Sequence, residues 1–96
     1  MSKLQQVGSH KTTIYTTGGY TCVKYHDTDV VKFNYHEVIL NSGGFRTSTT
    51  KLRMNQAASE FGLGYRVFQK NFEWFVQYNG VVYNFIDGMV FNRTNI

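Results

Sequence analysis

Short segments in which apolar and polar residues alternate, separated by turn residues, run through most of the chain and predict β-strands. In the clearest segment, residues 72–78 (FEWFVQY), Phe72 and every second residue after it face one way, and Glu73, Phe75 and Gln77 face the other. Other strands are predicted at residues 12–17, 20–26, 30–34, 37–41, 65–70 and 81–85, with a short last one at 89–91. Gly-Gly at 18–19 and Asn-Gly at 79–80 are typical two-residue hairpin turns, so antiparallel pairing is expected.

One segment has a helical period instead. Its apolar residues are spaced i, i+3, i+4 and i+7, which places them on one face; they are Met54, Ala57, Ala58 and Phe61. The hydroxyl residues Ser48–Thr50 are candidate N-caps. Gly62 is placed to end the helix in a left-handed conformation, with Leu63 packing back on the last turn. We therefore predict a helix from about Thr50 to Phe61.

These elements predict an α+β fold of about seven short antiparallel strands, with one central helix (about 50–61) packed on the sheet. The 96 residues correspond to a single domain, 1–96. Its polar ends, residues 1–11 and 92–96, are expected to be loose. The chain has no proline, so Gly, Asn and Asp must form the turns.

The positive charge is concentrated around the predicted helix. Formal net charge is +4. The window 46–70 accounts for all of it, because its one acidic residue is Glu60 and its basic residues are Arg46, Lys51, Arg53, Arg66 and Lys70. Such a cluster favours an anionic partner such as nucleic acid.

The start of the helix is one candidate anion-binding site. Free N–H groups and the positive end of the helix dipole attract anions there. The Walker phosphate-binding sequence is not matched, because its second Gly is missing. The expected binding residues are Arg46, Thr49, Thr50, Lys51 and Arg53. The alternative is that the hydroxyls only cap the helix and the basic side chains are solvated.

The strand after the helix is a second candidate, because Arg66 and Lys70 alternate onto the same face as Phe68. Sheets that bind single-stranded nucleic acid stack bases on aromatic rings and hold phosphates with basic side chains. The alternative is that Phe68 and its aromatic neighbours belong to the core. The chain matches no ribonucleoprotein consensus.

No pattern indicates catalysis, a metal or a cofactor, and we expect none of the three. Cys22 lies within a strand, away from any helix N-terminus that would activate its thiol. The three histidines lack the spacing of zinc ligands. His26, Asp27 and Asp29 could hold a divalent ion, but a polar turn is the simpler interpretation.

The expected location is the cytoplasm. A single cysteine cannot form an intramolecular disulfide, which is typical of a reducing compartment. The N-terminus lacks the apolar segment of a secretion signal, and no run approaches the roughly 18 apolar residues of a membrane span.

A set of short sequences between about residues 20 and 90 points to a family. The set is Ile39-Leu40-Asn41 with Gly43-Gly44, Thr49-Thr50 with Arg53-Met54-Asn55-Gln56, Leu63-Gly64, Gln69-Lys70, Trp74-Phe75-Val76 and Asp87-Gly88-Met89. In these short sequences the chain resembles a family of small tailed-phage proteins. Phe45 departs from the pattern, which commonly has Trp there. The resemblance implies a phage accessory protein made in a bacterial cytoplasm, and it implies no mechanism.

The leading hypothesis is a non-enzymatic phage accessory protein that binds an anionic partner, above all nucleic acid, through the seven predicted binding residues. Three alternatives remain open: an inhibitor of a host defence or transcription protein, an oligomeric trap for an anionic nucleotide, and a structural part of the virion.

Overall fold

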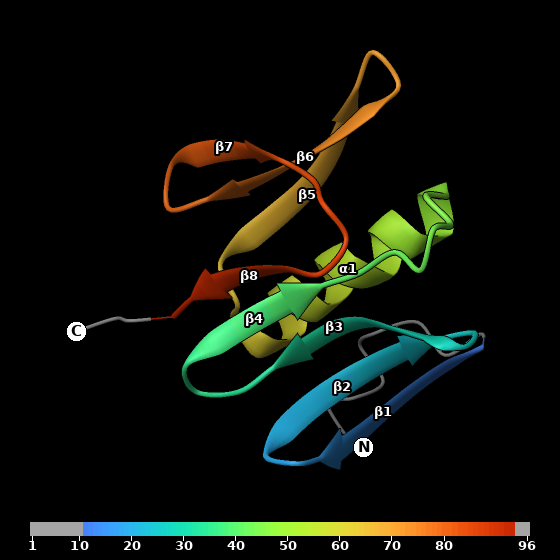
Figure 1. Ribbon diagram of the computed structural model, residues 1–96, viewed down its shortest axis with the longest axis vertical. Coiled ribbons are helices and arrows are strands. Elements are labelled where there is room, and N and C mark those ends of the chain that lie inside the picture. Colours follow the sequence, from blue (N-terminus) through green and yellow to red (C-terminus); the bar gives the residue numbers. More distant parts are fainter. Residues whose placement is uncertain (1–10, 94–96) are drawn as a thin grey trace.

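The described part of the chain, residues 11–93, forms eight strands and one helix in a computed structural model (Figure 1). The strands are β1 (Thr12–Thr17), β2 (Tyr20–Tyr25), β3 (Thr28–Phe33), β4 (Glu37–Leu40), β5 (Tyr65–Lys70), β6 (Glu73–Tyr78), β7 (Val81–Asn84) and β8 (Met89–Asn92). The helix, α1, is Ser48–Phe61. The predicted α+β class is confirmed, with eight strands where about seven were expected.

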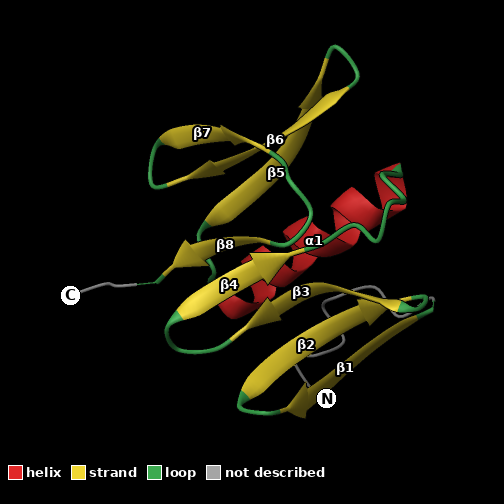
Figure 2. Cartoon of the chain, in the orientation of Figure 1, coloured by secondary structure: helices red, strands yellow, loops and turns green. Residues whose placement is uncertain are grey.

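The strands divide into two antiparallel sheets (Figure 2). The larger has the order β1-β2-β3-β4-β8, and the smaller is the meander β5-β6-β7. After β7 the chain returns to the first sheet, where β8 pairs with β4 from Glu37↔Asn92 to Leu40↔Met89. This division was not predicted, because alternation within a strand does not determine which distant strand it pairs with.

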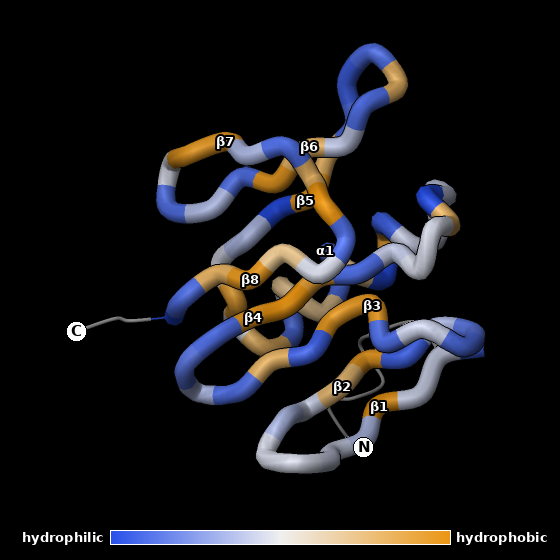
Figure 3. Tube along the Cα trace, in the orientation of Figure 1, coloured by the Kyte–Doolittle hydropathy of each residue, from blue (hydrophilic) through white to orange (hydrophobic). Residues whose placement is uncertain are grey.

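The helix packs against β2 and β3 of the larger sheet and against β5 of the smaller one. Figure 3 shows apolar segments on β3 and β4. The predicted helical stripe supplies the middle of the core: Met54 and Ala57 are fully buried, Ala58 is buried and Phe61 is half-buried. The core residues around it include Val23, Val31, Val38, Leu40, Val67, Trp74 and Val76.

The helix starts earlier than predicted. Its N-cap is Thr47, not one of residues 48–50, and the side-chain oxygen of Thr47 accepts from the backbone N–H of Thr50 at 3.2 Å. Thr47 has the extended backbone that an N-cap needs, whereas Ser48 is already helical. The predicted stop is confirmed: Gly62 has φ 64°, and the N–H of Leu63 donates to the Ala58 carbonyl at 2.9 Å.

Strand boundaries differ slightly from the prediction. The β2–β3 turn lies at 26–27 and not at 27–29, so β3 begins at Thr28. Residues 1–10 and 94–96 lie outside the described residues, so the expectation that they are loose stays a prediction. Asn92, assigned to the loose end, pairs with Glu37 in β8.

The turn between β5 and β6 is Asn71-Phe72, so Phe72 is not part of the strand predicted at 72–78. Asn71 has φ 53° and Phe72 has φ 67°. Positive φ at both central residues is typical of a type I′ hairpin turn. A bulky side chain is rarely found in this region, where backbone strain costs about 1–3 kcal/mol.

The side chain of Asn55 joins α1 to the edge of the smaller sheet. Its Nδ2 donates to the Val67 carbonyl and its Oδ1 accepts from the Val67 N–H, both at 2.8 Å. In the β5–β6 register Val67 occupies a position whose backbone groups point away from β6. Asn55 therefore satisfies two edge groups that the sheet leaves open, and Tyr65 adds a 2.6 Å bond to the Met54 carbonyl.

We predict that Asn55→Ala lowers the free energy of unfolding by about 2–4 kcal/mol, because two backbone groups of the buried Val67 lose their partner. Chemical denaturation measures this loss. Ser59→Ala, at an exposed position of the same helix, is the control and should change stability by less than about 0.5 kcal/mol. If Asn55→Ala lowers the free energy of unfolding no more than the control does, water molecules replace the Asn55 amide as hydrogen-bond partners of Val67.

Candidate nucleic-acid interface

The side of the smaller sheet that faces away from the core combines aromatic and basic residues. In β5, Tyr65 and Val67 are buried, whereas Arg66 and Lys70 are exposed and Phe68 is half-buried. The register places Phe75 of β6 beside Phe68. We call this side the outer face; its residues are Arg66, Phe68, Lys70, Glu73, Phe75, Gln77, Val82 and Asn84.

Two stacked rings form the middle of the outer face. The centroids of Phe68 and Phe75 are 5.6 Å apart with an interplanar angle of 27°. The guanidinium of Arg66 lies 4.8 Å from the Phe68 centroid, close enough for a cation–π contact. Both rings are only half-buried, so part of each remains accessible to a ligand. The outer face therefore offers π-surfaces next to fixed positive charge.

The sequence left open whether the aromatic residues of this region are core or surface, and the structure divides them. Tyr65, Trp74 and Phe85 are buried on the helix side, at 4–5% exposure. Phe68 and Phe75 lie on the opposite side, as the alternation of residues 65–78 indicates. Phe72 was predicted to share a face with Trp74, and it lies instead at the hairpin tip with 94% exposure.

The predicted helix-start residues do not form one site with the outer face. The guanidinium of Arg46 lies 4.9 Å from the Phe85 ring, and the Lys51 ammonium lies 6.0 Å from the Trp74 ring. Lys51 also donates to Gln69 at 3.3 Å. Because Trp74 faces the helix, these two cations belong to the other side of the small sheet.

Two predicted binding residues are buried and serve the fold. Thr50 is 1% exposed, and its hydroxyl bonds that of Thr47 at 3.0 Å. Arg53 is 7% exposed and donates to Thr12 at 3.0 Å and to Gln56 at 3.2 Å. Thr49 is partly exposed in the first helical turn. Of the seven predicted residues, only Arg66 and Lys70 lie on the outer face.

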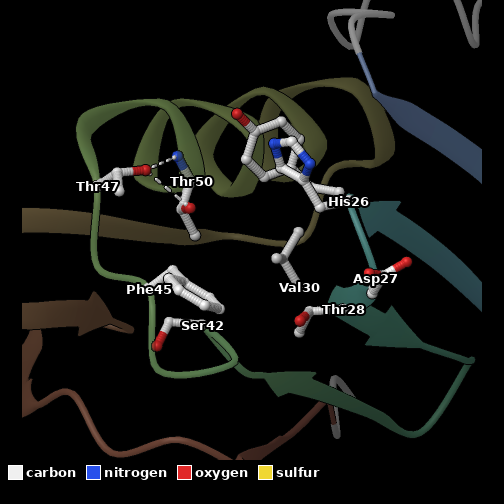
Figure 4. Close-up of a pocket in the computed structure, with 9 residues that line it drawn as sticks. His26, Asp27, Thr28, Val30, Ser42, Phe45, Thr47 and Thr50 are labelled. Carbon is white, nitrogen blue, oxygen red and sulfur yellow. Dashed lines mark hydrogen bonds between the residues drawn. The ribbon is translucent and has the colours of Figure 1, made fainter.

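A cavity of about 370 Å³ lies between the helix start and the β2–β3 turn (Figure 4). Thr47 and Thr50 lie at its helix end, with Asp27 and Thr28 opposite. It is lined by Tyr25, His26, Asp27, Thr28, Val30, Ser42, Phe45, Thr47 and Thr50. Its lining contains one carboxylate and no Lys or Arg, so it adds no support to the hypothesis of an anionic-nucleotide trap.

The side of the larger sheet that faces away from the helix is electrostatically balanced. The Tyr15 hydroxyl donates to both oxygens of Asp29 at 2.7 and 2.8 Å, and the Tyr20 hydroxyl donates to Glu37. These bonds raise the pKa values of both tyrosines above their usual value. Lys32 lies 4.9 Å from the Tyr20 ring. Because acidic and basic groups alternate on this side of the sheet, it has no concentration of positive charge that would attract an anionic partner.

Buried Tyr65 also has its pKa raised, by desolvation. Cys22 is fully buried, in agreement with a structural role. Within residues 11–93, no helix has the length and apolar character needed to cross a membrane.

The model of one protein family, described as Kyanoviridae Gp96 protein, matches residues 1–92. No curated protein and no solved structure matches the chain.

We predict that Arg53→Met lowers the free energy of unfolding by about 1.5–3 kcal/mol, because hydrogen bonds from a charged donor are lost in the interior. Arg66→Met is the control: it removes an exposed cation–π contact and should lower stability by less than about 1 kcal/mol. Denaturant unfolding of both variants measures the difference. Equal losses would contradict the structural role of Arg53.

Proposed function

Since the chain belongs to the Kyanoviridae Gp96 protein family, a family of phage proteins, we propose that it is a non-enzymatic phage accessory protein that binds single-stranded nucleic acid in the cytoplasm of the bacterial host. The resemblance to small tailed-phage proteins is thereby confirmed. The proposed binding surface is the outer face.

The observation that carries the proposal is the half-exposed Phe68–Phe75 pair with Arg66 and Lys70 on the same face. Bases of a single strand are free to stack on aromatic rings, and each stacked base contributes about 1–3 kcal/mol. In the proposed complex, Arg66 and Lys70 hold the phosphates on either side of Phe68. In a duplex the bases stack on each other and leave the two rings no planar partner.

Charge favours a nucleic acid over a host protein as the partner of this face. Its ionisable residues are two cations, Arg66 and Lys70, and one anion, Glu73, around an aromatic centre. The central part of a protein–protein interface is normally depleted of Lys and Glu, whereas Arg and aromatic residues are common there. Lys70 and Glu73 are therefore the residues that argue against a protein partner, whereas Arg66 beside the ring pair is compatible with either partner.

The test is the salt dependence of binding to labelled single-stranded DNA, single-stranded RNA and duplex DNA, followed by fluorescence anisotropy between about 50 and 200 mM salt. We expect single strands to bind more tightly than the duplex. In the double variant Arg66→Gln/Lys70→Gln, the slope of log affinity against log salt should decrease in magnitude by about 1.4, because each phosphate contact contributes about 0.7.

The matched control is Lys11→Gln/Lys24→Gln, which removes the same charge from β2 of the larger sheet and from the residue just before β1. It should leave the slope nearly unchanged. If the two double variants lose affinity equally, the attraction is nonspecific and the outer face is not the site. If the wild-type protein binds none of the three nucleic acids at low salt, the proposal is wrong.

A further inference from the structure

The tip of the β5–β6 hairpin holds an aromatic side chain in a strained and solvated position. Phe72 has φ 67°, in the left-handed region, and its side chain is 94% exposed. Among the described residues no ring or cation lies in contact with it, whereas Phe68 and Phe75 contact each other. Packing within residues 11–93 therefore does not account for a phenylalanine here.

The same chain forms two similar turns without this strain. Gly18-Gly19 joins β1 to β2 with φ values of 58° and 86°, and Asn79-Gly80 joins β6 to β7 with 52° and 80°. Both have Gly as the second residue, which removes the steric conflict between Cβ and the backbone. Asn71-Phe72 has the same backbone form with a large side chain at that place. Strained residues of this kind concentrate at ligand-binding sites.

The position of Phe72 relative to the outer face suggests what it contacts. The pair Lys70↔Glu73 closes the turn, and the pair Phe68↔Phe75 lies two residues further along the hairpin. With a rise of about 3.3 Å per residue, the ring pair is about 10 Å from the tip. From β5 into the turn the order is aromatic at 68, basic at 70 and aromatic at 72, which matches the alternation of bases and phosphates in a nucleic-acid strand.

We propose that Phe72 is a second stacking residue, which receives an unpaired base from the strand bound on the outer face. This inference rests on the proposed function and assigns the hairpin tip to the same site. The neighbours of Phe72 in the turn are Lys70, Asn71 and Glu73, all polar. A lone ring among polar residues suits a base, which has a π-face and polar edges, better than an apolar protein surface or the interior of a bilayer.

The test compares stability and binding in three variants of the full chain. Phe72→Gly should raise Tm by about 4–8 °C, because it relieves the backbone strain. It should also weaken binding to labelled single-stranded DNA or RNA by roughly 5- to 150-fold, which corresponds to the loss of one stacked base. Phe72→Trp should retain or improve binding, and Phe72→Leu should lose it, because leucine is apolar but has no ring.

The control is Gly80→Phe, which introduces the same strain at the β6–β7 turn. It should lower Tm and leave affinity unchanged. Wild-type affinity in Phe72→Gly would overturn the role of Phe72 and leave the outer face as the site. Wild-type affinity in Phe72→Leu would show that a ring is not required, and it would overturn stacking. If the wild-type protein binds no single strand, both the inference and the proposed function are wrong.

Discussion

The two hydrogen bonds between Asn55 and the backbone of Val67 fix the edge of the smaller sheet against the helix, beside the apolar core that both sheets share. The helix belongs to the core of the larger sheet through Met54 and Ala57, and the smaller sheet reaches that core through the helix side of β5 and β6. An amide side chain is suited to this place because it donates and accepts at once, as a neighbouring strand would. With the β5 edge covered in this way, one side of β5-β6-β7 is fixed towards the core and the other is left accessible.

The features that could be predicted from the sequence are those that depend on the spacing of residues within one strand or one helix. Alternation along residues 65–78 correctly separates Phe68 and Phe75 from Trp74 and Val76, because the two sides of a strand follow a period of two. The spacing of Met54, Ala57 and Ala58 identifies the buried side of the helix for a similar reason. The stop at Gly62 depends on residues within one turn, and it too was predicted correctly.

The remaining features depend on contacts between residues distant in sequence. Arg53 looks like a surface cation until the structure places it against Thr12, 41 positions earlier in the chain. The importance of Asn55 is visible only from its hydrogen bonds to the backbone of Val67, and no local sequence pattern indicates them. Phe72 was assigned to a strand because its apolar character continues the alternation of residues 72–78. The one local indication of a turn was Asn71, which tolerates positive φ, and it did not show that the next residue shares that conformation.

The return of β8 to the first sheet has a consequence for the order of folding during synthesis. Leu40 pairs with Met89 across 49 residues, so β4 lacks its outer neighbour until residues 89–92 have left the ribosome. The helix and the whole β5-β6-β7 meander are synthesised before that strand is available. Such long-range pairing slows folding and leaves an open strand edge during translation. A chain stopped before β8 would carry the complete outer face on a molecule whose larger sheet is unfinished.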